Sequence, residues 1–306
     1  MKGIEHLWAI LLAAGEGERV RSLTHDRQGR HVPKQFWSLD GGDSLLRLAI
    51  RRAEALVPKH RIVPVVAAQH RHWWKAELRD LDPEKVVVQP QNKGTAVGIL
   101  LPLAYVLRTD PLARLFVLPT DHLVKQEDVL GRAMVAAAMA VVANPGRVVL
   151  LGMVPHGNDQ DYGWIIPASA TCETRPGRVQ SFVEKPDGGK ARLLAQQGGL
   201  LNSFIMAASG GTLLQLFQRT MPDLTNRFLY GHIHSQAHLR ALERFYRSVP
   251  KCDFSRDVLE ASPAWLSVIP VPDCGWADVG TPARLLPLLD GTSREDARMT
   301  DSPPPP

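Results

Sequence analysis

The stretch Trp8-Ala-Ile-Leu-Leu-Ala-Ala14 runs directly into Gly15-Glu-Gly-Glu-Arg19, and this junction decides how the fold is interpreted. The unbroken apolar run predicts a strand that is buried on both faces, as in a parallel sheet covered by helices. Glycines after such a strand let the backbone approach a phosphate closely and point several N–H groups at it. The junction therefore predicts a phosphate-binding turn at the carboxyl end of the first strand.

Strand-like and helix-like segments alternate through the first half of the chain. Apolar runs predict strands at 62–68, 86–88, 115–119 and 147–153, and helical spacing of apolar residues predicts helices at 44–57, 70–81, 95–108 and 129–143. This alternation is typical of right-handed βαβ crossovers. We expect an α/β fold with a Rossmann-like, mostly parallel mixed sheet flanked by helices. Ligands bind beyond the carboxyl ends of such strands, so Gly15, Gln89 and Asp121 are expected to converge on one cleft.

The second half has a more mixed pattern. It predicts strands at 162–166, 179–183, 200–208 and 265–271, and helices at 188–197, 212–219 and about 236–247. The first two of these strands are expected to be antiparallel. We expect a single domain over residues 1–290, divided into halves at about 1–155 and 156–290. Residues 291–306 are polar and end in four prolines, which predicts a disordered tail.

Composition narrows the classes of partner. The formal net charge of +5 fits small anionic substrates, and without a run of Lys or Arg it disfavours nucleic acid. No apolar stretch approaches the ~20 residues of a membrane span, so we expect no membrane partner. Cys172, Cys252 and Cys274 are scattered without metal-binding spacing, which favours a reducing, cytoplasmic location. The sequence leaves the choice between a monomer and a homo-oligomer open.

The residues around the glycine turn disfavour two common phosphate loops. A dinucleotide-binding turn needs GxGxxG and an acidic residue after the second strand, but Val20 and Gln69 stand at these positions. This disfavours an NAD-dependent oxidoreductase, and the Walker pattern GxxxxGK[ST] is also missing. The turn alone is equally well interpreted as a plain strand-to-helix connection. Lys34, which follows Pro33, favours phosphate binding, because a cation there can neutralise phosphate oxygens.

Two carboxylates suit a magnesium site. Asp121 follows the strand predicted at 115–119, and Asp278 lies in Gly275–Gly280, after the strand predicted at 265–271. Mg²⁺ prefers a few carboxylates together with phosphate oxygens. Taken singly, each Asp is better interpreted as a turn or capping residue. The pair makes Mg²⁺ the expected cofactor.

Polar residues also lie at strand ends in the second half. Glu184-Lys185 ends the strand predicted at 179–183, and Asn202 opens the strand predicted at 200–208. A Glu–Lys pair can accept protons from hydroxyls and donate to a phosphate, and an Asn amide can bind sugar hydroxyls. The alternatives are an exposed ion pair, which stabilises little, and an ordinary turn residue.

A series of short motifs occurs in a fixed order along residues 8 to about 285. They are Leu12–Arg19, Pro33–Phe36, Gln89–Ala96, Val117–His122, Tyr162–Trp164, Phe182–Pro186, Leu201–Ser203 and Gly275–Gly280. Together they resemble the sugar-1-phosphate nucleotidyltransferases, also called nucleotide-sugar pyrophosphorylases. Pro33–Phe36 and Gly275–Gly280 favour the mannose-1-phosphate guanylyltransferase branch. Most of the motifs are loose singly, but the ordered set is specific.

The resemblance implies a reaction in which an NTP and a sugar 1-phosphate give an NDP-sugar and pyrophosphate by Mg-assisted in-line attack. GTP and mannose 1-phosphate are the favoured pair. Catalysis would consist of positioning and charge neutralisation by Arg19, Lys34 and Asp121. The resemblance places nucleotide binding in the first half, at Ala14, Gly15, Gly17, Gln89, Gly94 and Thr95. It places sugar-phosphate binding in the small antiparallel part, at Tyr162, Gly163, Glu184, Lys185 and Asn202, and Mg²⁺ at Asp121 and Asp278.

Several positions depart from the pattern of this family, and two of them support an alternative function. Glu18 stands where Thr is usual, and a carboxylate beside a triphosphate repels it unless the side chain points outward. Phe204 stands where Gly is usual, and the strand after it is expected to crowd the sugar pocket. Both favour the alternative of a weak or inactive regulatory relative that binds a nucleotide or nucleotide sugar on the same fold. Retention of Arg19, Lys34 and the two Asp residues favours the enzyme.

Overall fold

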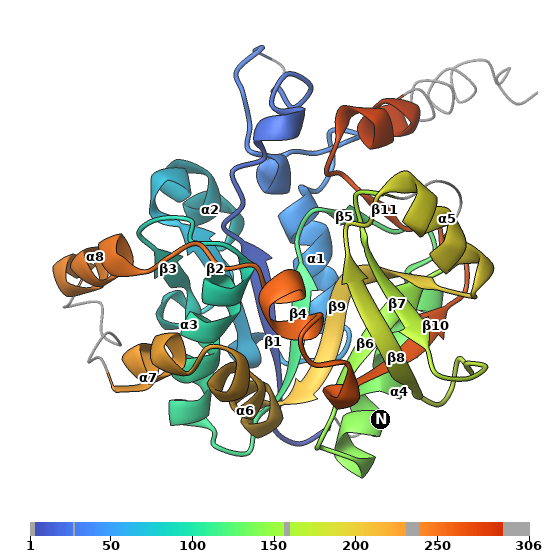
Figure 1. The fold of residues 1–306 in the computed structure, drawn as a ribbon. Coiled ribbons are helices and arrows are strands. Elements are labelled where there is room, and N and C mark those ends of the chain that lie inside the picture. Colours follow the sequence, from blue (N-terminus) through green and yellow to red (C-terminus); the bar gives the residue numbers. More distant parts are fainter. Residues whose placement is uncertain (1–3, 27, 156–159, 231–238, 290–306) are drawn as a thin grey trace, which may run out of the picture.

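The computed structural model describes residues 4–26, 28–155, 160–230 and 239–289, which are built around a mixed β-sheet (Figure 1). The strands of this sheet lie in the order β3-β2-β1-β4-β9-β6-β10-β8-β7. Their bounds are β1 Leu7–Ala13, β2 Ile62–Ala67, β3 Val87–Gln89, β4 Arg114–Pro119, β6 Val148–Met153, β7 Gly163–Pro167, β8 Gly177–Glu184, β9 Leu200–Ser209 and β10 Leu266–Val271. The predicted fold class is confirmed.

Strand β1 lies inside the sheet and is buried on both faces. It pairs in parallel with β2 and β4, so the first half supplies a parallel block. Leu7, Ala9 and Leu11 pack into one core, whereas Trp8 and Ile10 pack into the core on the opposite face. Helices α1, α2, α4 and α5 contribute to the first core, and α3, α6, α7 and α8 contribute to the second. This two-sided burial explains why the strand is an unbroken apolar run.

The helices follow the predicted ranges closely. Their bounds are α1 Leu45–Glu54, α2 Arg71–Glu77, α3 Thr95–Thr109, α4 Glu127–Ala143, α5 Gly188–Gln196, α6 Gly210–Thr220, α7 Pro222–Tyr230 and α8 Leu239–Ser248. Ser44 caps α1 as predicted, since its hydroxyl accepts from the N–H of Arg47 at 3.1 Å. Helix α2 is shorter than the predicted 70–81. Helix α7 was not predicted; it begins at Pro222, a residue suited to the first turn.

The second half adds antiparallel strands to the same sheet. Strand β9 runs antiparallel between β4 and β6, and β7 pairs antiparallel with both β8 and β9. The sheet is therefore continuous across residue 155, and the division into two halves stays a prediction. A separate ribbon pairs β5 (His122–Leu123) with β11 (Ala277–Asp278). Asp278 thus lies within a strand, whereas the sequence placed it in a turn after one.

Some predictions concern features that the structure does not test. The tail at 291–306 lies outside the described residues. Among the described helices, none is long and apolar enough to cross a membrane. The cytoplasmic location and the oligomeric state stay predictions.

Candidate active site

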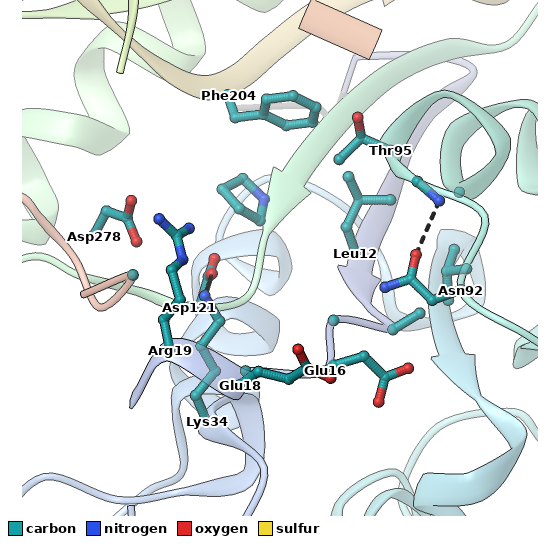
Figure 2. Close-up of a pocket in the computed structure, with 18 of the residues that line it drawn as sticks. Leu12, Glu16, Glu18, Arg19, Lys34, Asn92, Thr95, Asp121, Phe204 and Asp278 are labelled. Carbon is teal, nitrogen blue, oxygen red and sulfur yellow. Dashed lines mark hydrogen bonds and ion pairs between the residues drawn. The ribbon is translucent and has the colours of Figure 1, made fainter. Parts of the chain in front are cut away.

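A cavity of about 820 Å³ opens where β1, β3 and β4 end (Figure 2). Its lining brings together the predicted nucleotide-binding, catalytic and metal-binding residues: Ala14, Gly15, Gly17, Arg19, Lys34, Gln89, Gly94, Thr95, Asp121 and Asp278. These residues come from distant parts of the chain. Their convergence confirms that the strand ends meet at one cleft.

The glycine turn has a defined backbone conformation. Gly17 has a φ of 67°, in the left-handed region, and begins a 3₁₀ turn at Glu18–Val20. The buried amide of Gln35 donates to the carbonyl oxygens of Ala13 and Gly15, at 3.1 and 3.0 Å. Gln35 therefore fixes the backbone between β1 and the turn. No local pattern in the sequence indicates this role, because the hydrogen bonds reach a backbone 20 residues away.

The two carboxylates of the turn differ in surroundings. Glu16 accepts a hydrogen bond from Gln69 at 2.6 Å and lies 3.8 Å from a ring nitrogen of His70. Glu18 is exposed at the rim of the cavity. Figure 2 shows both side chains at the same edge of the cavity, below Asp121 in this view. Glu18 lines the cavity, so the expected repulsion of a triphosphate stays a prediction.

Lys34 lies between the glycine turn and the carboxylates. Its 3₁₀ turn, Lys34–Phe36, begins after Pro33, which has an extended ψ of 135°. The ammonium pairs with the carboxylate of Asp121, and both side chains are mostly buried. Burial lowers the pKa of Lys34, but Asp121 and Asp278 outweigh burial and raise that pKa above its ordinary value. Lys34 is therefore a fixed positive charge at the centre of the cleft.

The small ribbon holds the two carboxylates side by side. Asp278 lies opposite His122, and the N–H of Val279 donates to the carbonyl oxygen of Asp121 at 3.1 Å. Burial would raise the pKa of Asp121, but Lys34 and His122 outweigh it and hold that pKa at about 2. Burial, together with repulsion from Asp121, raises the pKa of Asp278 to about 6. Lys34 and Arg284 offset part of the negative charge of this pair, and a bound cation would relieve the repulsion that remains.

Two further groups border the carboxylates. Arg284 donates to Asp278 at 2.8 Å, and its guanidinium carbon lies 3.8 Å from the ring centre of Tyr162. Burial lowers the pKa of His122 to about 4, so the imidazole is neutral near pH 7. Its Nδ1 accepts from the indole of Trp276 at 3.1 Å. These contacts make His122 a neutral support for the ribbon, whereas Arg284 offsets part of the charge of Asp278.

The end of the cavity near β3 is shaped by the segment before α3. Gln89 is almost fully buried at the end of β3, and the side chain of Asn92 accepts from the N–H of Gly94 at 2.9 Å. Gly94 has a φ of 88°, and a side chain there would clash with the carbonyl of Cys252. The hydroxyl of Thr95 accepts from the N–H of Phe254 at 2.8 Å. This end of the cavity is therefore fixed to the segment near residue 254.

The predicted sugar-phosphate residues lie beyond this cavity. Among the described residues that line the cavity, none belongs to this predicted set, which is Tyr162, Gly163, Glu184, Lys185 and Asn202. Tyr162 lines a second cavity of about 210 Å³, together with Asp278 and Arg284. Glu184 is buried 3.4 Å from the ammonium of Lys185, and burial raises the pKa of its carboxyl. Asn202 is buried and bonded within the protein. Their proposed contacts with a sugar phosphate stay predictions.

Other lining residues had no assigned role. Asn92 lies inside the motif Gln89–Ala96, where Gly94 is a local signal of a constrained turn. Lys251 and Asp253 reach the cavity from the segment after α8. Nothing in the sequence near them indicates a ligand, because their approach depends on the packing of residue 252 against Gly94.

Comparisons with known proteins agree with this geometry. A protein-family model described as "Nucleotidyl transferase" matches residues 8–293. The xanthan biosynthesis protein XanB of Xanthomonas campestris pv. campestris (strain B100) is 30% identical, over 95% of this chain and 61% of its own. Mannose-1-phosphate guanylyltransferase 2 of Escherichia coli O157:H7 is 27% identical, over 89% of this chain and 58% of its own. The chain thus spans about three-fifths of the length of these relatives.

Solved structures show the same fold. One is named mannose-1-phosphate geranyltransferase and comes from Thermus thermophilus; it matches with a TM-score of 0.77 and 26% identity. The match covers 90% of this chain and 76% of that one. The likeness thus extends over nearly all of the described sheet and its helices.

Proposed function

The chain belongs to the nucleotidyl transferase family, and from this premise we propose that it transfers a nucleotidyl group from an NTP to a sugar 1-phosphate. The products would be an NDP-sugar and pyrophosphate. The observation that carries the proposal is the convergence of the glycine turn, Lys34 and Asp121 on one cavity. A glycine turn, a fixed cation and a carboxylate are the parts that binding and transfer of a phosphate group require.

The residues of the chain act by positioning and neutralising charge. The turn containing Gly15 and Gly17 would hold the triphosphate through its backbone, and Arg19 would neutralise the departing pyrophosphate. Lys34 would lie beside the attacked α-phosphate, where its charge offsets the approach of two anions. A sugar 1-phosphate is already ionised at neutral pH. The attacking oxygen therefore needs no general base.

The carboxylate pair fits Mg²⁺. Asp121 directly precedes β5 and Asp278 lies on β11, the strand paired with β5, and the repulsion between the two carboxylates contributes to the raised pKa of Asp278. Among the described residues, no cluster of three or more His, Cys, Asp or Glu side chains forms a closed metal site. Mg²⁺ commonly binds one or two carboxylates and completes its shell with water and substrate phosphates. When bound, it would supply further neutralisation of the phosphate oxygens.

We assign GTP and mannose 1-phosphate as the preferred pair. The support is a relative named mannose-1-phosphate guanylyltransferase 2 at 27% identity. The buried Gln89 at the end of β3 and Thr95 at the start of α3 lie where a base would be bound. Glu184 and Lys185 remain the proposed acceptor residues, and a sugar would have to reach them from the cleft. The side-chain oxygen of Asn202 is already bonded to Phe204, so Asn202 would act by holding the neighbouring backbone.

A panel assay tests the proposal. Each of the four common NTPs is combined with several sugar 1-phosphates in Mg²⁺ buffer, and pyrophosphate release is measured. We expect turnover with at least one pair, fastest with GTP and mannose 1-phosphate. Direct nucleotide binding is measured in parallel. Binding without turnover by any pair would contradict the enzyme and favour the regulatory alternative.

A further inference from the structure

Phe204 has a backbone conformation that is costly for its side chain. Its φ is 60°, and the described residues contain only two other non-glycine residues with positive φ, His6 and Lys185. A bulky residue in the left-handed region is an outlier, because its Cβ crowds the backbone. Such strain persists only where the surrounding structure imposes it, and it is concentrated at functional sites.

The surrounding strand holds Phe204 in this conformation through specific hydrogen bonds. Strand β9 loses register with β6 between Leu150 and Gly152, which forms a bulge opposite Leu151. The side-chain oxygen of Asn202 accepts from the N–H of Phe204 at 3.1 Å. The hydroxyl of Ser203 donates to the carbonyl oxygen of Leu151 and accepts from the N–H of Ile205, at 2.7 and 3.1 Å. The bulge is therefore a built feature of β9.

The consequence is the direction of the ring. Phe204 lines the large cavity, and Figure 2 shows its ring across the cavity from the glycine turn, on the far side from Glu16 and Glu18. The ring packs edge-on against Phe254, with centroids 6.1 Å apart. Phe254 is itself fixed, since its N–H donates to Thr95. The ring is thus a firmly held wall of the cleft.

The same bulge removes Asn202 from the cavity. The amide of Asn202 accepts from Phe204 and approaches the hydroxyl of Ser255 at 3.5 Å, and only 7% of the residue is exposed. The polar side chain expected to bind sugar hydroxyls is therefore used to hold the turn. The neighbouring residue Phe204 lines the cavity instead and presents an aromatic ring to it. A wall formed by such a ring recognises shape and apolar surface.

We propose that Phe204 is a specificity-determining residue of the acceptor site, where its ring packs against the C–H face of the sugar of a sugar 1-phosphate. A substituent that projects from that face would collide with the ring, so the ring discriminates between sugars that differ at one carbon. The inference rests on the proposed function. It goes further than the proposed function, because it names the side chain that selects the sugar 1-phosphate.

Three variants distinguish the effect of the aromatic ring from the effect of its volume and from a general effect of losing an aromatic contact. Phe204→Gly removes the ring and suits a φ of 60°. Phe204→Leu keeps much of the volume but removes the aromatic face. Phe245→Leu is the matched control, because Phe245 packs against Phe228 on α7 and lies outside the residues that line the cavity. Initial rates are measured for each with a set of epimeric sugar 1-phosphates, at saturating NTP.

We expect Phe204→Gly to raise the KM for the preferred sugar 1-phosphate about 10-fold or more, and to narrow the discrimination between epimers. Phe204→Leu should raise that KM less and keep the discrimination, because bulk remains in the wall. The KM for the NTP should stay within about 2-fold in both variants, and Phe245→Leu should change neither constant. Thermal unfolding with a single transition confirms that the variants are folded.

Two results would overturn the inference while leaving the proposed function intact. One is an unchanged KM and an unchanged ranking of sugars in Phe204→Gly. The other is a rise in the KM for the NTP alone, which would place the ring against the nucleotide. If the wild type turns over no pair, the proposed function fails, and calorimetric titration of the same sugar 1-phosphates decides the inference. Equal affinity for wild type and Phe204→Gly, or no binding to either, would then refute it.

Discussion

The glycine turn after β1 and the bulge in β9 lie on opposite sides of one cavity, and each contains a left-handed residue. Gly17 has a φ of 67° and Phe204 a φ of 60°. At Gly17 a Cβ would meet the backbone and side chain of Lys34 at 3.2–3.3 Å, so the position works because a side chain is missing. At position 204 a residue with a large ring adopts the same conformation, and the side chain of Asn202 holds it there by accepting from the N–H of Phe204.

The difference teaches how one cleft can serve two ligands. One wall presents backbone, which suits a triphosphate because oxygen anions need closely spaced N–H groups. The opposite wall presents a side chain, which suits a ligand recognised by shape. Lys34 and the two carboxylates lie between the walls and belong to both. Lys34 and Asp278 belong to this shared centre, and Gly15 and Gly17 belong to the backbone wall.

Lys34→Ala should have the largest effect. We expect kcat to fall about 10²- to 10³-fold, because the fixed positive charge that we propose lies beside the attacked phosphate would be lost. Pyrophosphate release at saturating substrates measures the change. The matched control is Lys59→Ala, since Lys59 is an exposed lysine whose partners are Glu54 and Asp80. Equal activity of the two variants would remove Lys34 from the chemistry.

Asp278→Asn should change stability in a pH-dependent way. The pKa of Asp278 is about 6 in the folded protein, above its ordinary value of 3.8. An acid with a raised folded-state pKa stabilises most below its unfolded pKa, and this contribution is lost as the pH rises through the folded-state pKa. In metal-free buffer at pH 7.5, Asp278→Asn should therefore be more stable than wild type by about 1–3 kcal/mol. Near pH 4 the difference should vanish.

Chemical denaturation across this pH range gives the measurement, and Mg²⁺ supplies its internal control. The ion should stabilise the wild type at pH 7.5 and have little effect on Asp278→Asn, because binding to the folded state raises its stability by mass action. A difference in stability that is independent of pH would show that Asp278 carries no raised pKa. Equal stabilisation of both proteins by Mg²⁺ would remove Asp278 from the metal site.

The backbone wall was predictable from the sequence, because local order determines it. A buried parallel strand is an unbroken apolar run, and its carboxyl end must open at the same edge of the sheet as its neighbours. Gly15, Gln89 and Asp121 were therefore expected together, and the structure brings them together. Lys34, placed after Pro33, already favoured phosphate binding, and the family resemblance was needed only to assign it a role in catalysis.

The wall formed by the bulge in β9 and the position of Asp278 were less predictable, because both depend on pairing between distant segments. The ribbon that holds Asp278 is only two residues per strand, too short to show any periodicity. The bulge at Phe204 follows from the registers of β9 with β6, which no local pattern reveals. Asn202 matched a sugar-binding motif by sequence, yet its side chain is bonded within the turn. The departure at Phe204 was visible in the sequence, but its direction into the cavity was not.

A comparison of Gly17→Ala with Gly15→Ala should distinguish the effect of backbone strain from the effect of weakened phosphate binding in the backbone wall. Gly17→Ala should lower the free energy of unfolding by about 1–2 kcal/mol, because alanine is strained at a φ of 67° and its methyl group presses on Lys34. Gly15 lacks both problems: its φ is not positive and nothing lies within 4 Å of an added Cβ. Gly15→Ala should therefore leave stability nearly unchanged. If a triphosphate lies against the turn, the methyl group of Gly15→Ala should still raise the KM for the NTP, by a few fold. Equal stability losses in the two variants would show that the conformation of Gly17 is not what shapes the turn.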